Sequence, residues 1–361
     1  MKVEFNDLQR ETQRFREEIT AAVGGVLDRG WYILGPEVEA FEKEFATYCG
    51  SSYAVGVANG TEALQLAIIG AGIEPASEVI TSPISAAFTA LGILAAGCIP
   101  VFADVDDSTL LIDPHKIHPT KKTRAIVPVH LYGNACRMDE IMDVARAEDL
   151  LVIEDACQAH GSSHDGRMLG TLGAVGCFSF YPTKNLGALG DGGMIVTDDD
   201  DVYHLVRMLR NGGQEGRYKH RVRGVNSRLD EIQAAVLRAR LAHLDEENAR
   251  RNEIADTYLD RLAHLPLKFV EQTEGRNSHL FPVRVANRDR VQSRLTEMGV
   301  STLIHYPMPI HHQEFMGSFP RPALPVAEIA STELLSLPLY PSLTEAEIDR
   351  VVASLEAALA D

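Results

Sequence analysis

The sequence lacks the paired cysteines of a zinc ribbon or a disulfide framework. Its 361 residues contain five cysteines, which lie far apart and include no C-x-x-C pair. An odd number of isolated cysteines favours buried, reduced thiols in a cytosolic protein. Residues 1–10 are a mixture of polar and charged side chains and lack the apolar core of a signal peptide. We therefore expect a cytoplasmic protein without structural disulfides or bound metal.

An excess of basic residues is also absent. The chain has 34 lysines and arginines against 51 acidic residues, which gives a formal net charge of −17. Such a charge repels polyanions, so the sequence predicts neither a nucleic acid nor an anionic membrane as a partner. A long apolar span is missing as well. The uncharged stretch at 79–103 is interrupted by prolines and glycines, and we interpret it as strand, helix and strand within a core.

What is present is a repeated alternation of short apolar runs and helical patterns. Repeated strand–helix–strand spacing indicates a parallel or mixed sheet that is covered by helices. The expected strands lie at 54–57, 78–80, 100–102, 125–129 and 150–153, and the expected helices at 11–29, 36–48, 61–70, 85–97 and 138–148.

The last third of the chain has a different pattern. We expect a long helix that follows Asp230, which could cap it, and extends to about Tyr258. Further strands are expected at 280–285 and 303–305, and further helices at 291–298 and 344–359. The pattern predicts a large domain of residues 1–245 and a smaller C-terminal α+β domain of residues 246–361.

The first motif that could carry chemistry is Asn59-Gly60-Thr61, between a predicted strand and a predicted helix. Gly60 would let a ligand approach the backbone, and the free N–H groups of the helix start, with the Thr61 hydroxyl, would hold a phosphate. When the motif is considered alone, an ordinary helix cap made by Thr61 is the better explanation.

Two further motifs follow predicted apolar segments. Asp155 ends a strand, where ligands bind in open α/β sheets, and it could hold a pyridine nitrogen protonated while Gln158 contacts a ring hydroxyl. Lys184 lies in an apolar, aromatic and glycine-rich stretch. Burial there would lower the pKa of its amine and make it usable for a Schiff base. Ser179 could bind the cofactor phosphate. The alternatives are a carboxylate that caps a turn and a lysine on the surface.

A fourth motif, at 224–231, precedes the long helix and follows a local concentration of basic residues. In so acidic a chain this run is a candidate site for a diphosphate, although a solvated or intersubunit basic face remains an alternative. Its members are Arg207, Arg210, Arg217, Lys219, Arg221 and Arg223, with Arg228 after them.

These four motifs together resemble one enzyme family. The segments NGTEAL, EDACQAHG, FSFYPTKNLG with GDGG, and GVNSRLDEIQAA are similar in order and spacing to the DegT/DnrJ/EryC1/StrS sugar aminotransferases. The resemblance extends from about Phe5 to the C-terminus. It implies the α/β fold of fold-type I pyridoxal-phosphate (PLP) transferases, with a mixed, mostly parallel sheet in the large domain. It also implies glutamate as amino donor and a nucleotide-linked keto sugar as acceptor.

The resemblance also implies roles for individual residues. Lys184 would carry PLP as a Schiff base, Asp155 would pair with the pyridinium nitrogen, and Gln158 would contact the ring hydroxyl. Asn226 would reach the phosphate in the neighbouring subunit, so that the active unit is a homodimer with shared sites. The cofactor phosphate would be held by Gly60, Thr61 and Ser179.

The resemblance is less complete at the face of the cofactor ring and at the substrate. Family members commonly stack an aromatic residue on the ring, and the matching place here falls on Ala86, with Phe88 two residues on. The segments WYILG and NSRLD are similar to members that aminate C3 of a 3-keto sugar, whereas 4-keto members tend to differ there. The expected substrate contacts are Lys219, Arg228, His305 and Tyr306.

Other functions are less well supported by the residues. A related sugar dehydratase would replace Lys184 with histidine, and a non-catalytic regulator on the same fold could lose that lysine. A nicotinamide enzyme needs G-x-G-x-x-G, and Pro75 occupies the third glycine position of the best candidate. A metal enzyme is not expected, because the adjacent His311 and His312 would face different directions.

Overall fold

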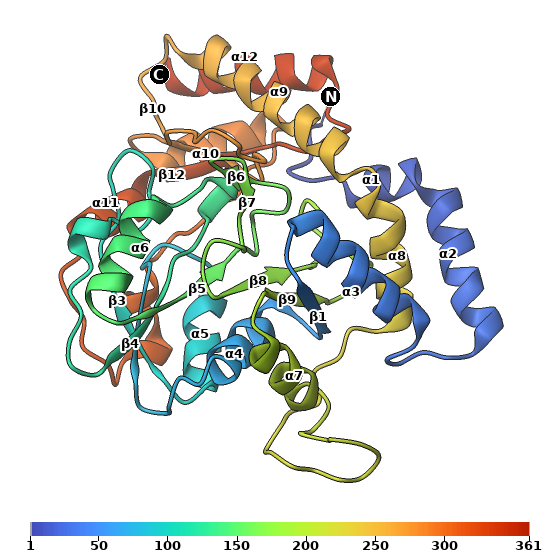
Figure 1. The fold of residues 1–361 in the computed structure, drawn as a ribbon. Helices are drawn as coiled ribbons and strands as arrows, with labels where there is room; N and C mark the ends of the chain where they lie inside the picture. Colours follow the sequence, from blue (N-terminus) through green and yellow to red (C-terminus); the bar gives the residue numbers. More distant parts are fainter. Residues whose placement is uncertain (1, 361) are drawn as a thin grey trace.

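The protein, described here over residues 2–360 of a computed structural model, is built around a seven-stranded sheet (Figure 1). Six strands share one direction, and only β9 is antiparallel to its two neighbours. In spatial order the strands are β1 (Tyr53–Val57), β9 (Gly193–Thr197), β8 (Val175–Ser179), β5 (Leu151–Asp155), β4 (Thr123–Val127), β2 (Glu78–Thr81) and β3 (Ile99–Phe102).

Helices cover both faces of this sheet, because its inner strands are apolar on both sides. Along β2, Val79 belongs to one apolar cluster and Ile80 to another, as expected when successive side chains point to opposite faces. One face is covered by α4 (Gly60–Gly70), α5 (Phe88–Ala95) and α7 (Asp200–Leu209). The other is covered by α3 (Pro36–Cys49), α6 (Met138–Ala147) and α8 (Glu231–Leu241).

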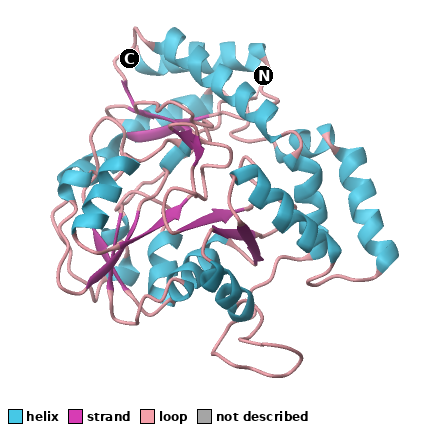
Figure 2. Cartoon of the chain, in the orientation of Figure 1, coloured by secondary structure: helices cyan, strands magenta, loops and turns pink. Residues whose placement is uncertain are grey.

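A second, antiparallel sheet lies in the C-terminal third and is separate from the first in Figure 2. It consists of β10 (Lys268–Phe269), β11 (Phe281–Arg284) and β12 (Leu334–Leu337). Apolar side chains of α9 (Leu244–Leu262), α10 (Arg288–Glu297) and α12 (Glu345–Leu359) form its core. The domain boundary at 245/246 stays a prediction.

Shorter elements complete the chain. The N-terminal helix α2 (Arg16–Arg29) packs against α8 and follows α1 (Leu8–Arg14). The others are the hairpin β6 (Ser163–His164) and β7 (Arg167–Met168), the helix α11 (Pro325–Glu333), and four 3-10 turns: η1 (Pro114–Lys116), η2 (Leu131–Gly133), η3 (Ile310–His312) and η4 (Glu314–Met316). Among the described residues no helix combines the length and apolar character needed to cross a membrane.

Four expectations from the sequence are wrong in detail. The helix expected at 11–29 breaks at Phe15, which is buried and stacks on His243 with ring centroids 4.7 Å apart. The long helix after Asp230 breaks before Leu244, and the Asp230 side chain makes no capping hydrogen bond. The strand expected at 303–305 is reduced to one bridge between Leu303 and Ser336.

Candidate active site

The sequence motifs meet at the carboxyl edge of the large sheet. Asp155 is the last residue of β5 and Ser179 the last residue of β8, so the parallel arrangement brings both to the same edge. Gly60, at the start of α4, packs directly on this edge. A Cβ atom added to Gly60 would lie 2.7 Å from the Ser179 Cβ and 2.9 Å from the Cys157 Sγ. No side chain fits at this position, which explains the glycine of the motif.

The first turn of α4 offers unused backbone donors. The N-cap is Asn59, whose side-chain oxygen accepts from the Glu62 amide at 2.9 Å, so the alternative role of Thr61 as the cap is excluded. Within residues 2–360 the amides of Gly60 and Thr61 have no hydrogen-bond acceptor. Free amides at a helix N-terminus attract an anionic group such as a phosphate.

Asp155 is held in one orientation by two donors. Its Oδ2 accepts a hydrogen bond from the Thr89 hydroxyl at 2.8 Å, and its Oδ1 accepts one from the Cys157 amide at 3.2 Å. The Ser85 hydroxyl lies 3.0 Å from that of Thr89 and extends the chain of contacts. Sequence reasoning missed Thr89. Its position just beyond β2, at the same edge of the sheet, was the available signal.

Gln158 has a fixed amide orientation. Its Oε1 accepts from the Tyr132 amide at 2.7 Å, so its nitrogen must point the other way, where it donates to the Tyr306 hydroxyl at 3.1 Å. One of the two N–H bonds of that amide remains free for a further acceptor. Tyr132, which the sequence did not single out, also donates through its hydroxyl to the carbonyl of His305 and so joins both segments.

Lys184 has the electrostatic environment expected from its apolar surroundings. Burial lowers the pKa of its amine, and the neighbouring carboxylate of Asp155 opposes that shift only in part. Burial also raises the pKa of the Cys157 thiol well above its ordinary value, so Cys157 stays uncharged. Lys184 as a whole is half-buried.

Three histidines near Lys184 are neutral. Burial, followed by the charge of Lys184, lowers the pKa of His160 to about 3 and that of His305 to about 4, and it lowers the pKa of His279 well below 6.5. His160 lies against the rings of Phe178 and Phe180, at centroid distances of 5.5 and 5.7 Å. Neither of its ring nitrogens has a hydrogen-bond partner in the described part of the chain.

The tautomer of His279 follows from a buried amide network. Asn185, the residue after Lys184, donates through Nδ2 to the Asn248 side chain at 2.8 Å and to the Asn277 carbonyl at 3.0 Å. Its Oδ1 must then accept, so His279 donates to it from Nδ1 at 2.8 Å. The neutral ring consequently carries its lone pair on Nε2, which can accept a hydrogen bond.

Not all of the predicted site residues meet in one chain. Tyr306 and His305 join the carboxyl edge through Gln158 and Tyr132, as described above. Asn226 and Lys219 instead lie exposed on the segment between α7 and α8, which extends away from the body of the molecule (Figure 1). Lys219 pairs with Glu215 at 3.4 Å. Phe88 is 62% exposed at the start of α5.

The basic run does not form one anion site within a single chain. Arg210 is buried and pairs with Glu42 below the sheet, while Arg207 donates to the Tyr203 hydroxyl at 2.9 Å. Arg228 donates to the Asn211 side chain at 2.9 Å. Arg228 forms no ion pair with Asp230 or Glu231 among the described residues. The Glu231 carboxylate instead accepts three backbone amides at the start of α3, from Gly35, Glu37 and Val38.

Comparison with known proteins identifies the family. The profile of the DegT/DnrJ/EryC1/StrS aminotransferase family matches residues 13–356. The chain belongs to this family. It is 44% identical over 358 residues to dTDP-3-amino-3,4,6-trideoxy-alpha-D-glucose transaminase of Streptomyces venezuelae, covering 97% of this chain and 94% of the relative. It is 40% identical to UDP-N-acetyl-3-dehydro-alpha-D-glucosamine 3-aminotransferase of Acidithiobacillus ferrooxidans. That match covers 98% of this chain and 97% of the relative.

Solved structures of the DegT/DnrJ/EryC1/StrS family have the same fold. The crystal structure of S. venezuelae DesV in complex with a ketimine intermediate superposes with a TM-score of 0.96 at 44% identity, covering 99% of this chain and 98% of that one. The expected fold class, a fold-type I PLP-dependent transferase, is confirmed by this similarity and by the mixed, mostly parallel sheet.

Proposed function

We propose that this protein transfers an amino group from L-glutamate to a nucleotide-linked keto sugar, with PLP as cofactor. The favoured acceptor is a dTDP- or UDP-linked 3-keto hexose that is aminated at C3. The observation that carries the proposal is the pairing of Lys184, whose amine pKa is lowered by burial, with the oriented carboxylate of Asp155 at one sheet edge. Desolvated lysines and ordered carboxylates are the groups that PLP chemistry requires.

The donor set fits each part of the cofactor. The free amides of Gly60 and Thr61, with Ser179 packed against Gly60, suit a phosphate. Asp155 would hold the pyridine nitrogen protonated, and the unused N–H of Gln158 would donate to the ring hydroxyl. When bound, PLP supplies the carbonyl carbon and the electron-accepting ring that carry the amino group between the two substrates.

The residues around Lys184 suit it to a proton-transfer role. A lysine whose pKa is lowered is more often neutral near pH 7, so it can accept a proton at Nζ and return it on the other side of the reaction. The surrounding His160, His279 and His305 are neutral and add no positive charge that would repel a protonated amine.

The sugar nucleotide is expected to bind at the open side of this edge. His305 and Tyr306 would contact it from the same chain, since Tyr306 adjoins Gln158. Lys219 and Arg228 would contact it from a second copy of the chain, whose Asn226 would reach the cofactor phosphate, in a homodimer with shared sites. The exposure of Asn226 and Lys219 supports this view, as does the projection of the segment between α7 and α8 in Figure 1. Phe88 is proposed to flank the cofactor ring in that assembly, since Ala86 has no aromatic side chain.

Amination at C3 is favoured over C4 by the names of the relatives. The S. venezuelae and A. ferrooxidans proteins are both named for 3-amino products or 3-dehydro substrates. Amination of a 4-keto sugar is the alternative. A regulator without catalysis would not require Lys184, Asp155 and Thr89 in this arrangement, so enzyme activity is the stronger proposal.

A substrate panel tests the proposal. The purified protein, supplied with PLP and glutamate, would be incubated with dTDP-, UDP- and GDP-linked 3-keto and 4-keto sugars. Mass spectrometry would detect amination, and NMR of the product would locate the nitrogen. We expect nitrogen at C3 of a dTDP or UDP sugar. Nitrogen at C4 would overturn the regiochemistry alone, whereas no amination of any sugar would overturn the function.

A further inference from the structure

Two histidines and a glutamate meet outside the site described above. His311 and His312 end η3, and Glu328 lies in α11. The Nε2 atoms of His311 and His312 lie 3.3 and 3.7 Å from the same oxygen, Oε1 of Glu328. One possible ligand atom from each of the three residues lies within 4.8 Å of the others. The expectation that adjacent histidines would face different directions is therefore wrong here.

The irregular backbone of η3 explains this convergence. A 3-10 turn is tight and short, and it brings the two neighbouring rings to a centroid distance of 4.2 Å with an interplanar angle of 55°. The turn is fixed to the large sheet, because the Ile310 amide donates to the Pro83 carbonyl at 2.8 Å. Both imidazoles thereby face α11, where Glu328 is held by the Leu324 amide at 3.1 Å.

The spacing fits a metal ion better than a set of hydrogen bonds. Zinc ligands at about 2.0–2.1 Å in a tetrahedron lie about 3.3–3.4 Å from one another. The separations of 3.3 and 3.7 Å to Glu328 are close to that value. As hydrogen bonds they are poor, since the His312 contact exceeds the usual N–H···O range. An ion between the three groups would satisfy all of them at once.

We propose that His311, His312 and Glu328 bind a divalent transition-metal ion of the zinc class. Two imidazoles and one carboxylate are a donor set that suits such ions. The His311 side chain is fully buried, whereas those of His312 and Glu328 are 40% and 35% exposed. The open side therefore faces solvent, and water completes the coordination.

Metal binding here would link two segments that contribute none of the residues proposed to bind the cofactor. It would join η3 to α11 and fix the end of the segment that begins with His305 and Tyr306. The expected consequence is greater thermal stability of that region, because a ligand that binds only the folded state stabilises it. The proposal does not depend on the sugar or on the regiochemistry of amination.

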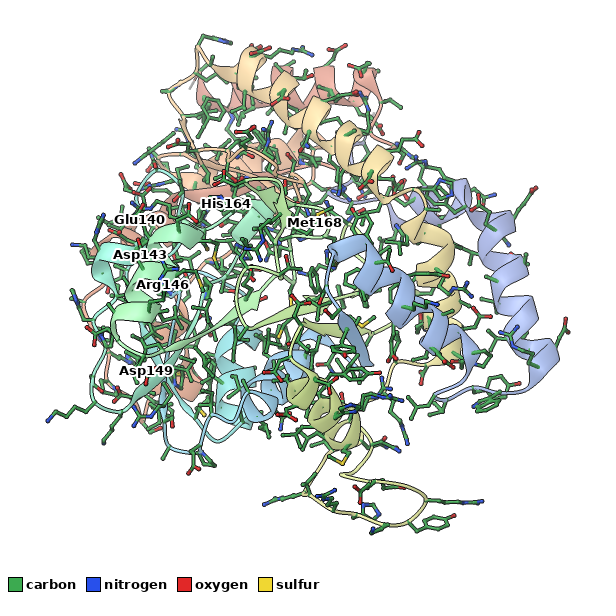
Figure 3. All side chains as sticks on the ribbon, in the orientation of Figure 1. Glu140, Asp143, Arg146, Asp149, His164 and Met168 are labelled. Carbon is green, nitrogen blue, oxygen red and sulfur yellow. The ribbon has the colours of Figure 1, made fainter. Side chains whose placement is uncertain are left out.

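A second group of residues provides a matched control. His164 lies beside α6 in Figure 3, with its Nε2 3.6 Å from Asp139, and Asp165 completes the group. Both carboxylates are more than 80% exposed. Because solvated carboxylates are held loosely, this group is not expected to bind an ion tightly. The variant His164→Gln therefore removes one surface imidazole without touching the proposed site.

The experiment uses the full chain with PLP bound, treated with a chelator and then dialysed into phosphate-free buffer. Zn²⁺ would be titrated by calorimetry into the wild-type protein and into His312→Gln, Glu328→Gln and His164→Gln. The amide of Glu328→Gln can still accept from the Leu324 amide, which preserves the helix start. Melting temperatures without metal would establish that each variant is folded.

We expect one Zn²⁺ per chain with micromolar or tighter affinity in the wild-type protein and in His164→Gln. The other two variants should bind at least tenfold more weakly, and Zn²⁺ should no longer raise their melting temperatures. Co²⁺ added to the wild-type protein should give visible absorption bands of nitrogen and oxygen coordination, a result that needs no variant. The proposal is overturned if the wild-type protein binds Zn²⁺ only at millimolar concentration, if the Co²⁺ bands are absent, or if His312→Gln and Glu328→Gln bind as the wild-type protein does.

Discussion

The carboxyl edge of the large sheet and the segment between α7 and α8 differ in how they hold their polar residues. At the edge, Asp155 and Gln158 are each 4% exposed and are fixed by donors and acceptors from the same chain. On the segment, Asn226 and Lys219 are exposed, and the backbone extends away from the body (Figure 1). The two residues proposed to contact the cofactor ring are thus fixed within one chain, whereas Asn226 and Lys219 are exposed as the proposed contacts with a second copy require.

Replacement of Lys184 is expected to have the largest effect, because it removes the amine that is proposed to react at the carboxyl edge of the large sheet. We expect Lys184→Ala to reduce transamination by about 10⁴-fold or more, because no other amine can take its place at the edge. Lys219→Ala, on the projecting segment, serves as the control and should weaken sugar-nucleotide binding alone. Borohydride reduction followed by peptide mapping should label Lys184 in the wild-type protein and in the control. A label on any other lysine would contradict the assignment.

Asp155 and Thr89 test whether orientation at the edge matters. Asp155→Asn should slow the glutamate half-reaction by about 10²–10³-fold, because the ring nitrogen loses its anionic partner. Thr89→Val removes the 2.8 Å hydrogen bond to Asp155 and should slow the same step by about tenfold. Thr89→Ser keeps the hydroxyl and should restore most of the rate. Stopped-flow absorbance measures all three, and a rate for Asp155→Asn within a few-fold of wild type would disprove the role.

Replacement of Arg228 tests whether the segment between α7 and α8 contributes to binding of the sugar nucleotide. Arg228→Ala should raise KM for the sugar nucleotide by about 10-fold or more and leave KM for glutamate unchanged, since a diphosphate loses a charge-assisted hydrogen bond. Its partner within the chain is the neutral Asn211, so little loss of stability is expected. A lowered melting temperature with equal effects on both substrates would instead indicate a structural role.

Mixed dimers test whether the two regions come from different chains. Lys184→Ala and Asn226→Asp protomers would be combined in equal amounts and allowed to exchange. Half of the resulting dimers would then be mixed, with one intact site of two, so activity should recover to about a quarter of wild type. The residual activity of each variant alone is the baseline. Verified mixed dimers without recovery would show that Asn226 does not serve the partner's site.

The smallest expected effect is on stability at acid pH. The pKa of His160 is about 3 in the folded protein, whereas an unfolded imidazole titrates near 6.5. Between these values the unfolded chain binds more protons, so the free energy of unfolding falls as the pH drops, by about 2 kcal/mol at pH 5 for one such histidine. In urea denaturation, the free energy of unfolding at pH 7 should exceed that at pH 5 by about 2 kcal/mol less in His160→Phe than in the wild-type protein.

Much of the fold was predictable because its local signals are strong. The strands near 54–57, 78–80, 100–102 and 150–153 form as expected, since short apolar runs between turn residues favour buried strands. The strands β8 and β9 were not predicted. Ser179 of the Lys184 motif is the last residue of β8, and the last glycine of that motif, Gly193, is the first residue of β9. Their residues were interpreted only as a chemical motif. In a run of this length, hydrophobic periodicity does not distinguish a buried strand from a segment of buried helix.

The breaks in the helices were not predictable in the same way. The apolar period continues through Phe15 and again through Ala242, so each pair of helices looks like one. Only packing decides the break, because Phe15 stacks on His243, and Leu244 is buried with α3 and α8 before α9 reaches the second sheet. The same limit applies to Thr89, whose hydroxyl meets Asp155 from a position 66 residues away in the sequence.

By itself, the sequence determined the kinds of group that this protein can use: a lysine in an apolar stretch, a carboxylate at the end of a strand and glycines beside a helix start. These are local properties, set by side-chain chemistry and by backbone preferences over a few residues. Tertiary structure alone decided which groups meet and in which state. It fixed the orientation of Asp155, the amide of Gln158 and the tautomer of His279, and it brought His311 and His312 to one carboxylate oxygen. The physical reason is that hydrogen-bond geometry and desolvation depend on distances between segments that are remote in the chain.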